Sequence, residues 1–230
     1  MSFFLFLKDN LRWLMAGVLL TFISSFGQTY FISIFAGELQ AEFDLSHGDW
    51  GGIYFLGTMA SGMLMIWAGG SADHFRVRTL AVVVILTLAA VCLAMSAISA
   101  VWMLPVIIFG LRFTGQGMTS HIAIVAMARW YVKARGKAIS VAGAGYAMGE
   151  AALPMIFVGL LMEYDWRTLW LFAAAVAVGS LPVLYWLLRS ERVPASVSER
   201  EDAAGMVGRH WRRAEVIRDW RFWGLVPIAT

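Results

Sequence analysis

Long apolar runs separated by short polar segments are the dominant pattern of the chain. The runs lie near residues 11–35, 51–71, 79–98, 101–126, 137–161 and 167–189. A helix needs about 20 mostly apolar residues to cross a membrane, and only helices and closed barrels satisfy their backbone polar groups within lipid. Because the runs are continuous rather than alternating, they predict six membrane-spanning helices and an all-α integral membrane protein.

The composition excludes other classes of protein. Hydrophobic residues make up 60% of the 230 residues and charged residues only 14%, whereas soluble domains are about 25% charged. A single cysteine, Cys92, argues against a disulfide framework or a cysteine-rich metal site. The motifs of hydrolases, metalloproteases and phosphate-binding loops do not occur. We therefore expect no catalytic residues, no metal and no cofactor.

The end of the chain predicts a protein in two parts. Residues 1–189 form the six-helix bundle, and residues 190–221 are polar and form a central linker. The linker is either solvated or a helix on the membrane surface. A further apolar run begins at Phe222 and stops at Thr230, so residues 222–230 are interpreted as the start of a truncated seventh helix in a longer protein.

Positive charge is strongly one-sided and predicts the orientation of the chain. Nearly all of the 18 Lys and Arg residues fall in the N-terminal segment, in the second and fourth loops and after residue 189. Arg167 lies on the opposite side, and Arg112 lies within a span. By the positive-inside rule, the N-terminus and residues 190–221 are cytoplasmic. The charge is thus a topology signal, and we expect no nucleic-acid partner.

The loop between the second and third runs carries a recognisable motif. Residues 69–78 read GGSADHFRVR and resemble the loop signature of the major facilitator superfamily, G-x-L-A-D-R-x-G-R-K. Gly69, Ala72 and Asp73 match, and Arg78 is a conservative match. Arg76 stands where the family has a glycine that permits a tight turn.

Further segments resemble the same family. The fourth run contains RFTGQG at residues 112–117, an arginine followed by small residues. The fifth run is rich in glycine, with Pro154 following Gly143, Gly145 and Gly149. Glu150 follows Gly149 where the antiporter form has proline, so an antiporter is not supported. The segment SSFGQT at residues 24–29 is similar to the bacterial branch related to monocarboxylate and oxalate–formate carriers.

The resemblance implies both a fold and a function. The chain would be the N-terminal half of a twelve-helix fold, built as a 3+3 inverted repeat. It would transport a small solute by alternating access, as a proton-coupled symporter or an exchanger, in a bacterial inner membrane. Gly69, Asp73 and Arg78 would form a conformational latch. The partners would be the solute, a coupling proton, the lipid bilayer and the C-terminal half of the same protein.

Arg112 and Glu150 are the charges that lie within the spans. At about 1.5 Å per residue they lie roughly 16 Å and 20 Å deep from opposite sides, and a charge at that depth costs at least about 2.5–3.5 kcal/mol. Arg112 is placed to hold an anionic solute such as a carboxylate, and Glu150 to carry a proton. The alternative is a structural ion pair between the fourth and fifth helices.

Polar side chains extend this candidate pathway. Gln116 lies one turn from Arg112 on the same face, whereas His121 points roughly opposite. Thr21, Ser24, Ser25 and Gln28 share one face of the first span, which either lines a water-filled path or packs against a neighbouring helix. We assign Gln28 to the pathway and Gly145, Gly149 and Pro154 to close helix packing.

A different class of protein is also compatible with the sequence. A non-transporting membrane protein, such as a sensor or the subunit of a membrane enzyme, would have the same apolar pattern. A sensor would need a soluble domain and an enzyme a cluster of reactive groups at one interface. Residues 1–230 contain neither pattern.

Overall fold

A computed structural model describes residues 3–190 and Arg218. Every regular element within residues 3–190 is a helix. The expected start of a seventh helix, at residues 222–230, and the linker after Ser190, apart from Arg218, lie outside the described residues.

Four helices are long and apolar enough to cross a membrane. They are α4 (His47–Ala68), α6 (Val77–Ser96), α9 (Arg135–Leu161) and α10 (Trp166–Leu187). They fall within a few residues of the predicted second, third, fifth and sixth spans. The short helix α5 (Ser71–His74) lies between α4 and α6. The start of α4 is fixed by a capping box, in which Ser46 and Asp49 bond each other's backbone N–H.

The first predicted span is broken rather than continuous. It consists of α1 (Phe3–Ile23), the 3₁₀ turn η1 (Ser24–Gly27), α2 (Thr29–Ile32), η2 (Ser33–Phe35) and α3 (Ala36–Glu42). Gln28 has extended backbone angles, φ −82° and ψ 153°, and the two parts meet at 45°. Taken together, they make a fifth candidate span. The prediction of an unbroken span here was wrong, because Gln28 leaves the helical conformation.

The fourth predicted span is helical throughout but changes its type. α7 (Met103–Leu111) runs into a π-helix, η3 (Arg112–Thr119), and then into α8 (Ser120–Trp130). The junction residues Leu111 and Thr119 keep right-handed helical angles. The side chain of Thr119 donates to the carbonyl of Thr114 at 2.6 Å, and that of Thr114 donates to Gly110 at 2.7 Å. These hydroxyls support carbonyls in a segment where the regular α-helical bonds are lost.

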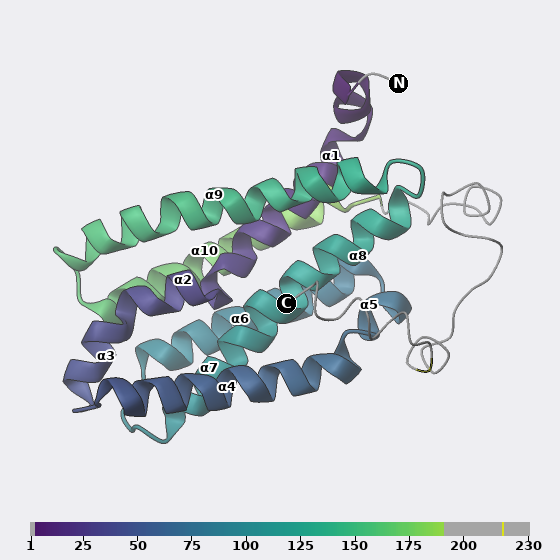
Figure 1. Ribbon diagram of the computed structural model, residues 1–230. Coiled ribbons are helices and arrows are strands. Elements are labelled where there is room, and N and C mark those ends of the chain that lie inside the picture. The colour runs from purple at the N-terminus through teal and green to yellow at the C-terminus, as the bar shows by residue number, and fades with distance from the viewer. Residues whose placement is uncertain (1–2, 191–217, 219–230) are drawn as a thin grey trace. The chain divides into compact units, whose positions relative to one another are not determined.

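The helices pair in a pattern with two-fold character. α1 packs along α9, α4 packs along α7 and η3, and α6 packs along α10; Figure 1 shows α9 alongside α1 and α4 beside α7. If the first span is exchanged with the fourth, the second with the fifth and the third with the sixth, the α1–α9 pairing becomes the pairing of the fourth span with α4. The α6–α10 pairing maps onto itself. This is the arrangement that two repeated three-helix units require.

The two irregular segments meet at a contact between glycines. A Cβ placed on Gly27 would clash with the carbonyl oxygen of Leu111 and lie 2.7 Å from the Cα of Gly115. A Cβ on Gly115 would lie 2.6 Å from the Cα of Gly27. The break in the first span and the π segment in the fourth therefore touch backbone to backbone, which only glycine permits.

The polar face of the first span is used for packing. Gly145 lies against the carbonyl of Val18 and the hydroxyl of Thr21, and Gly149 lies against Ser25 Oγ. Thr21 Oγ1 also donates to the carbonyl of Ala142 at 2.5 Å. Gly145 and Gly149 are thus at a close helix contact. Pro154 lies inside α9, which stays helical through it.

An ion pair joins the far end of the first span to the start of the sixth. Arg167 donates to both carboxylate oxygens of Glu42 at 2.5 Å and to the carbonyl of Ile98 at 2.9 Å. Trp166 Nε1 also donates to Glu42 at 2.9 Å. We call this group, Glu42, Trp166 and Arg167, the end clamp.

The glycine contact predicts a sharp dependence on side-chain size. Replacing Gly27 with Ala should lower the melting temperature of the full-length protein in detergent, because the backbones must separate; overpacking typically costs about 1–3 kcal/mol. Gly179→Ala on α10 is the matched control, since nothing lies within 4 Å of its added Cβ. Equal melting temperatures for the two variants would contradict the contact.

Candidate functional site

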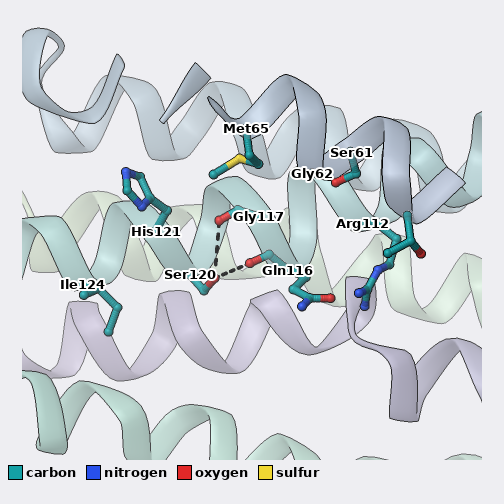
Figure 2. A pocket seen from close by; sticks show the side chains of 10 residues that line it. Ser61, Gly62, Met65, Arg112, Gln116, Gly117, Ser120, His121 and Ile124 are labelled. Carbon is teal, nitrogen blue, oxygen red and sulfur yellow. Dashed lines mark hydrogen bonds between the residues drawn. The ribbon is translucent and has the colours of Figure 1, made fainter. Parts of the chain in front are cut away.

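A cavity of about 520 Å³ lies between α4 and the helical segments η3 and α8 of the fourth span. Figure 2 shows Ser61, Gly62 and Met65 on one wall, with Arg112, Gln116 and His121 on the other. The lining residues are Thr58, Ser61, Gly62 and Met65 of α4, Arg112, Gln116 and Gly117 of η3, and Ser120, His121 and Ile124 of α8. The π segment therefore supplies the cavity with its charge and its amide.

Arg112 is held by neighbours from two other spans. Its Nη1 donates to Thr29 Oγ1 at 2.9 Å, and its Cζ lies 5.7 Å from the centre of the Tyr54 ring. The Tyr54 hydroxyl donates to the same Thr29 oxygen at 3.0 Å. Among the described residues, Arg112 has no carboxylate partner. Its charge is therefore only partly compensated, by a hydroxyl and an aromatic face.

Two polar atoms of the cavity walls lack partners. Gln116 Oε1 and Thr58 Oγ1 are buried and have no hydrogen-bond partner among the described residues. Gln116 also lies beside Arg112 on the cavity wall, as the sequence predicted. Ser120 is already engaged, because its hydroxyl donates to the carbonyls of Gln116 and Gly117. A buried polar atom without a partner is costly, so these two atoms favour a polar occupant.

The prediction that His121 points away from Arg112 was wrong. Both side chains line the same cavity. Nine residues at about 100° each would place them on opposite faces of an α-helix. A π-helix is wider and turns less per residue, so η3 rotates His121 to the cavity side. There its Nε2 lies 2.9 Å from the carbonyl oxygen of Gly69.

Glu150 is separate from the cavity and from Arg112. It is exposed on α9, is not among the lining residues and forms no ion pair with Arg112 among the described residues. The alternative of a structural ion pair between the fourth and fifth helices is therefore not found among the described residues. The Tyr146 ring, one turn before Glu150 on α9, packs edge-on to Tyr30 at 5.7 Å.

Gln28 lies at the break and not on the cavity wall. It is 6% exposed, and its carbonyl accepts hydrogen bonds from the backbone N–H groups of Phe31 and Ile32. It thereby caps the second part of the span. Sequence reasoning missed the residue after it, Thr29, which faces Arg112. Sequence reasoning also missed Met65 as part of the cavity wall.

Two side chains of the fourth span contact backbone carbonyls of the loop motif at residues 69–78. Besides the contact of His121 with Gly69, Arg129 Nη1 donates to the carbonyl of Ala72 at 2.8 Å. The guanidinium of Arg78 lies over the Tyr185 ring at 5.0 Å. The side chain of Asp73, and with it the proposed latch to Arg78, lies outside the described residues. Arg76 has a φ of −65°, so this turn does not need glycine.

Among the side chains that the structure describes, no group of three or more His, Cys, Asp and Glu is arranged to hold a metal ion. Cys92 is buried in α6, within the apolar core. The cavity instead combines one guanidinium, hydroxyls, an amide and an imidazole with the side chains of Met65 and Ile124. Such a lining suits a small solute with an anionic end and an apolar body.

Gly62 offers a direct test of the cavity. An added Cβ on Gly62 would have nothing within 4 Å, so Gly62→Leu should fill the cavity without disturbing the packing. Uptake of a solute that uses the cavity should fall at least tenfold in the full-length protein, while the melting temperature stays unchanged. Gly179→Leu, on a helix that does not line the cavity, is the control. Normal uptake in the Gly62 variant would exclude the cavity from the path.

Comparison with known proteins agrees with this architecture. A search of curated proteins finds no match to the chain. The family model described as Major Facilitator Superfamily matches residues 17–230, which is nearly the whole chain and includes the cavity, the π segment and the loop motif. The helical bundle is consistent with the N-terminal half of that fold. The chain belongs to the Major Facilitator Superfamily of membrane transporters.

Proposed function

We propose that the protein is a secondary active transporter that moves a small carboxylate by alternating access. The observation that carries this proposal is Arg112, an arginine without a carboxylate partner among the described residues, in a cavity between two of the predicted spans. A charge in this position is expensive and usually marks a functional site. An anionic solute would compensate it, since charge-assisted hydrogen bonds to a guanidinium are strong.

The cavity walls support a solute with further polar groups. Gln116 and Thr58 have buried polar atoms without partners, and small rearrangements would bring them to the solute. The apolar side chains of Met65 on α4 and Ile124 on α8 would contact its apolar part. The C-terminal half of the protein would complete the binding site from the other side.

Orientation and coupling belong to the same proposal. By the positive-inside rule, the distribution of Lys and Arg favours a cytoplasmic N-terminus and cytoplasmic residues 190–221, and we assign the protein to a bacterial inner membrane. Glu150 is exposed on the side of α9 that carries Tyr146, where a proton-carrying carboxylate in a symporter would be reached by water. The segment with Gly69, Asp73 and Arg78 would act as the latch between conformations.

The role of Arg112 is tested by uptake into proteoliposomes. The full-length protein would be offered a panel of carboxylates, sugars and drugs, with and without a pH gradient. Wild-type protein should take up at least one carboxylate, and Arg112→Gln should lose that uptake by tenfold or more, because the anion loses its partner. Arg135→Gln, at the exposed start of α9, is the control. Uptake confined to neutral solutes would overturn the carboxylate assignment.

The role of Glu150 is tested by separating coupling from movement. Replacing Glu150 with Gln removes the ionisable group but keeps its size, so proton-driven accumulation should disappear while carboxylate exchange across the membrane continues. The measurement compares the pH dependence of net uptake with the rate of exchange in the same vesicles. Glu163→Gln, in the turn after α9, is the control. An unchanged pH dependence in the Glu150 variant would show that protons use another residue.

A further inference from the structure

Thr29 occupies an unusual position in the first span. It is the first residue of α2, directly after the extended residue Gln28. In an unbroken helix a residue here would follow the register of Thr21 and Ser25, which face α9. The break changes that register. Thr29 is instead exposed on the side where α4 and η3 meet.

The hydroxyl oxygen of Thr29 is shared by two side chains. It accepts a hydrogen bond from Arg112 Nη1 at 2.9 Å and another from the Tyr54 hydroxyl at 3.0 Å. A hydroxyl oxygen has two acceptor sites, and both are used. The hydroxyl oxygen of Thr29 in the first span therefore holds both the Arg112 guanidinium of the fourth span and the Tyr54 hydroxyl of the second.

The helix that carries Thr29 is a firm support. Phe31, two residues later, packs edge-on against Phe157 at 4.8 Å and Trp170 at 5.4 Å. Phe31 and Phe35 are fully buried. The end clamp holds the end of α3 through Glu42. Arg112 has a long, flexible side chain, and its described hydrogen bond is the one to this support.

We infer that Thr29 is a positioning residue, which orients the Arg112 guanidinium for an anionic solute without binding the solute itself. The inference rests on the proposed function of Arg112 and extends it to the first span. One N–H of the guanidinium is occupied by Thr29, and the remaining donors are left for the anion. Preorganisation of this kind increases affinity because less side-chain entropy is lost on binding.

Transport by the full-length protein tests the inference. Thr29→Val keeps the shape of the side chain and loses the acceptor, so KM for a transported carboxylate should rise about fivefold to tenfold, the size of one hydrogen bond. The kcat should stay within about twofold. Thr29→Ser should restore the wild-type KM. Thr87→Val, whose hydroxyl bonds only Val83 of its own helix at 2.9 Å, is the control for losing a threonine hydroxyl.

A second measurement needs no solute. Phenylglyoxal modifies guanidinium groups, and the modified peptide containing Arg112 can be followed by mass spectrometry. Release from Thr29 should make Arg112 react several-fold faster in Thr29→Val and not in Thr29→Ser. Arg129, which bonds Ala72, should react at the same rate in all variants.

The outcomes separate the inference from the proposed function. Unchanged KM and unchanged modification of Arg112 in Thr29→Val would overturn the positioning role while leaving carboxylate transport intact. If the wild-type protein transports no carboxylate, the proposed function fails. The modification rate alone then decides whether Thr29 orients Arg112. A defect that Thr29→Ser shares with Thr29→Val would also overturn the inference, because it would not depend on the hydroxyl.

Discussion

The contact between Gly27 and Gly115 is the constraint on which the site depends. It brings the backbone of the first span against that of the fourth at the point where each departs from α-helical geometry. In lipid there is no hydrophobic drive between helices, so close packing and interhelical hydrogen bonds hold them together. With the two backbones this close, Thr29 lies within hydrogen-bond distance of Arg112. Any side chain at residue 27 or 115 would move these groups apart.

The irregular segments supply functional geometry at a modest energetic cost. The break at Gln28 is capped by its own carbonyl, and hydroxyls of Thr114 and Thr119 bond carbonyls around the π segment. Non-helical backbone is tolerated at membrane depth when protein or a water-filled cavity surrounds it. The π segment is bordered by the core on one side and by the cavity on the other, and the break in the first span is buried against it. The polar residues that mark these segments therefore both satisfy the backbone and form the site.

Much of the fold could be predicted from the sequence, because membrane spans depend on composition over about 20 residues. The apolar runs identified the five candidate spans of the described residues, and small residues identified the close contact at Gly145 and Gly149. The break at Gln28 and the π segment could not be predicted, since neither contains proline and both depend on packing between distant spans. The error over His121 arose because regular α-helical rotation was assumed, whereas the π segment rotates side chains. The alternative of an Arg112–Glu150 ion pair rested on matched depth, which does not determine the face of α9 on which Glu150 lies.

The end clamp changes how the break in the first span should be understood. A helix interrupted by one extended residue would ordinarily be a point of flexing. Here the part beyond the break is bound at its far end by Arg167 and along its length by the rings of Phe157 and Trp170. The part before the break is packed along α9. The break is therefore a fixed bend rather than a hinge, and this half of the protein would have to move as one rigid body.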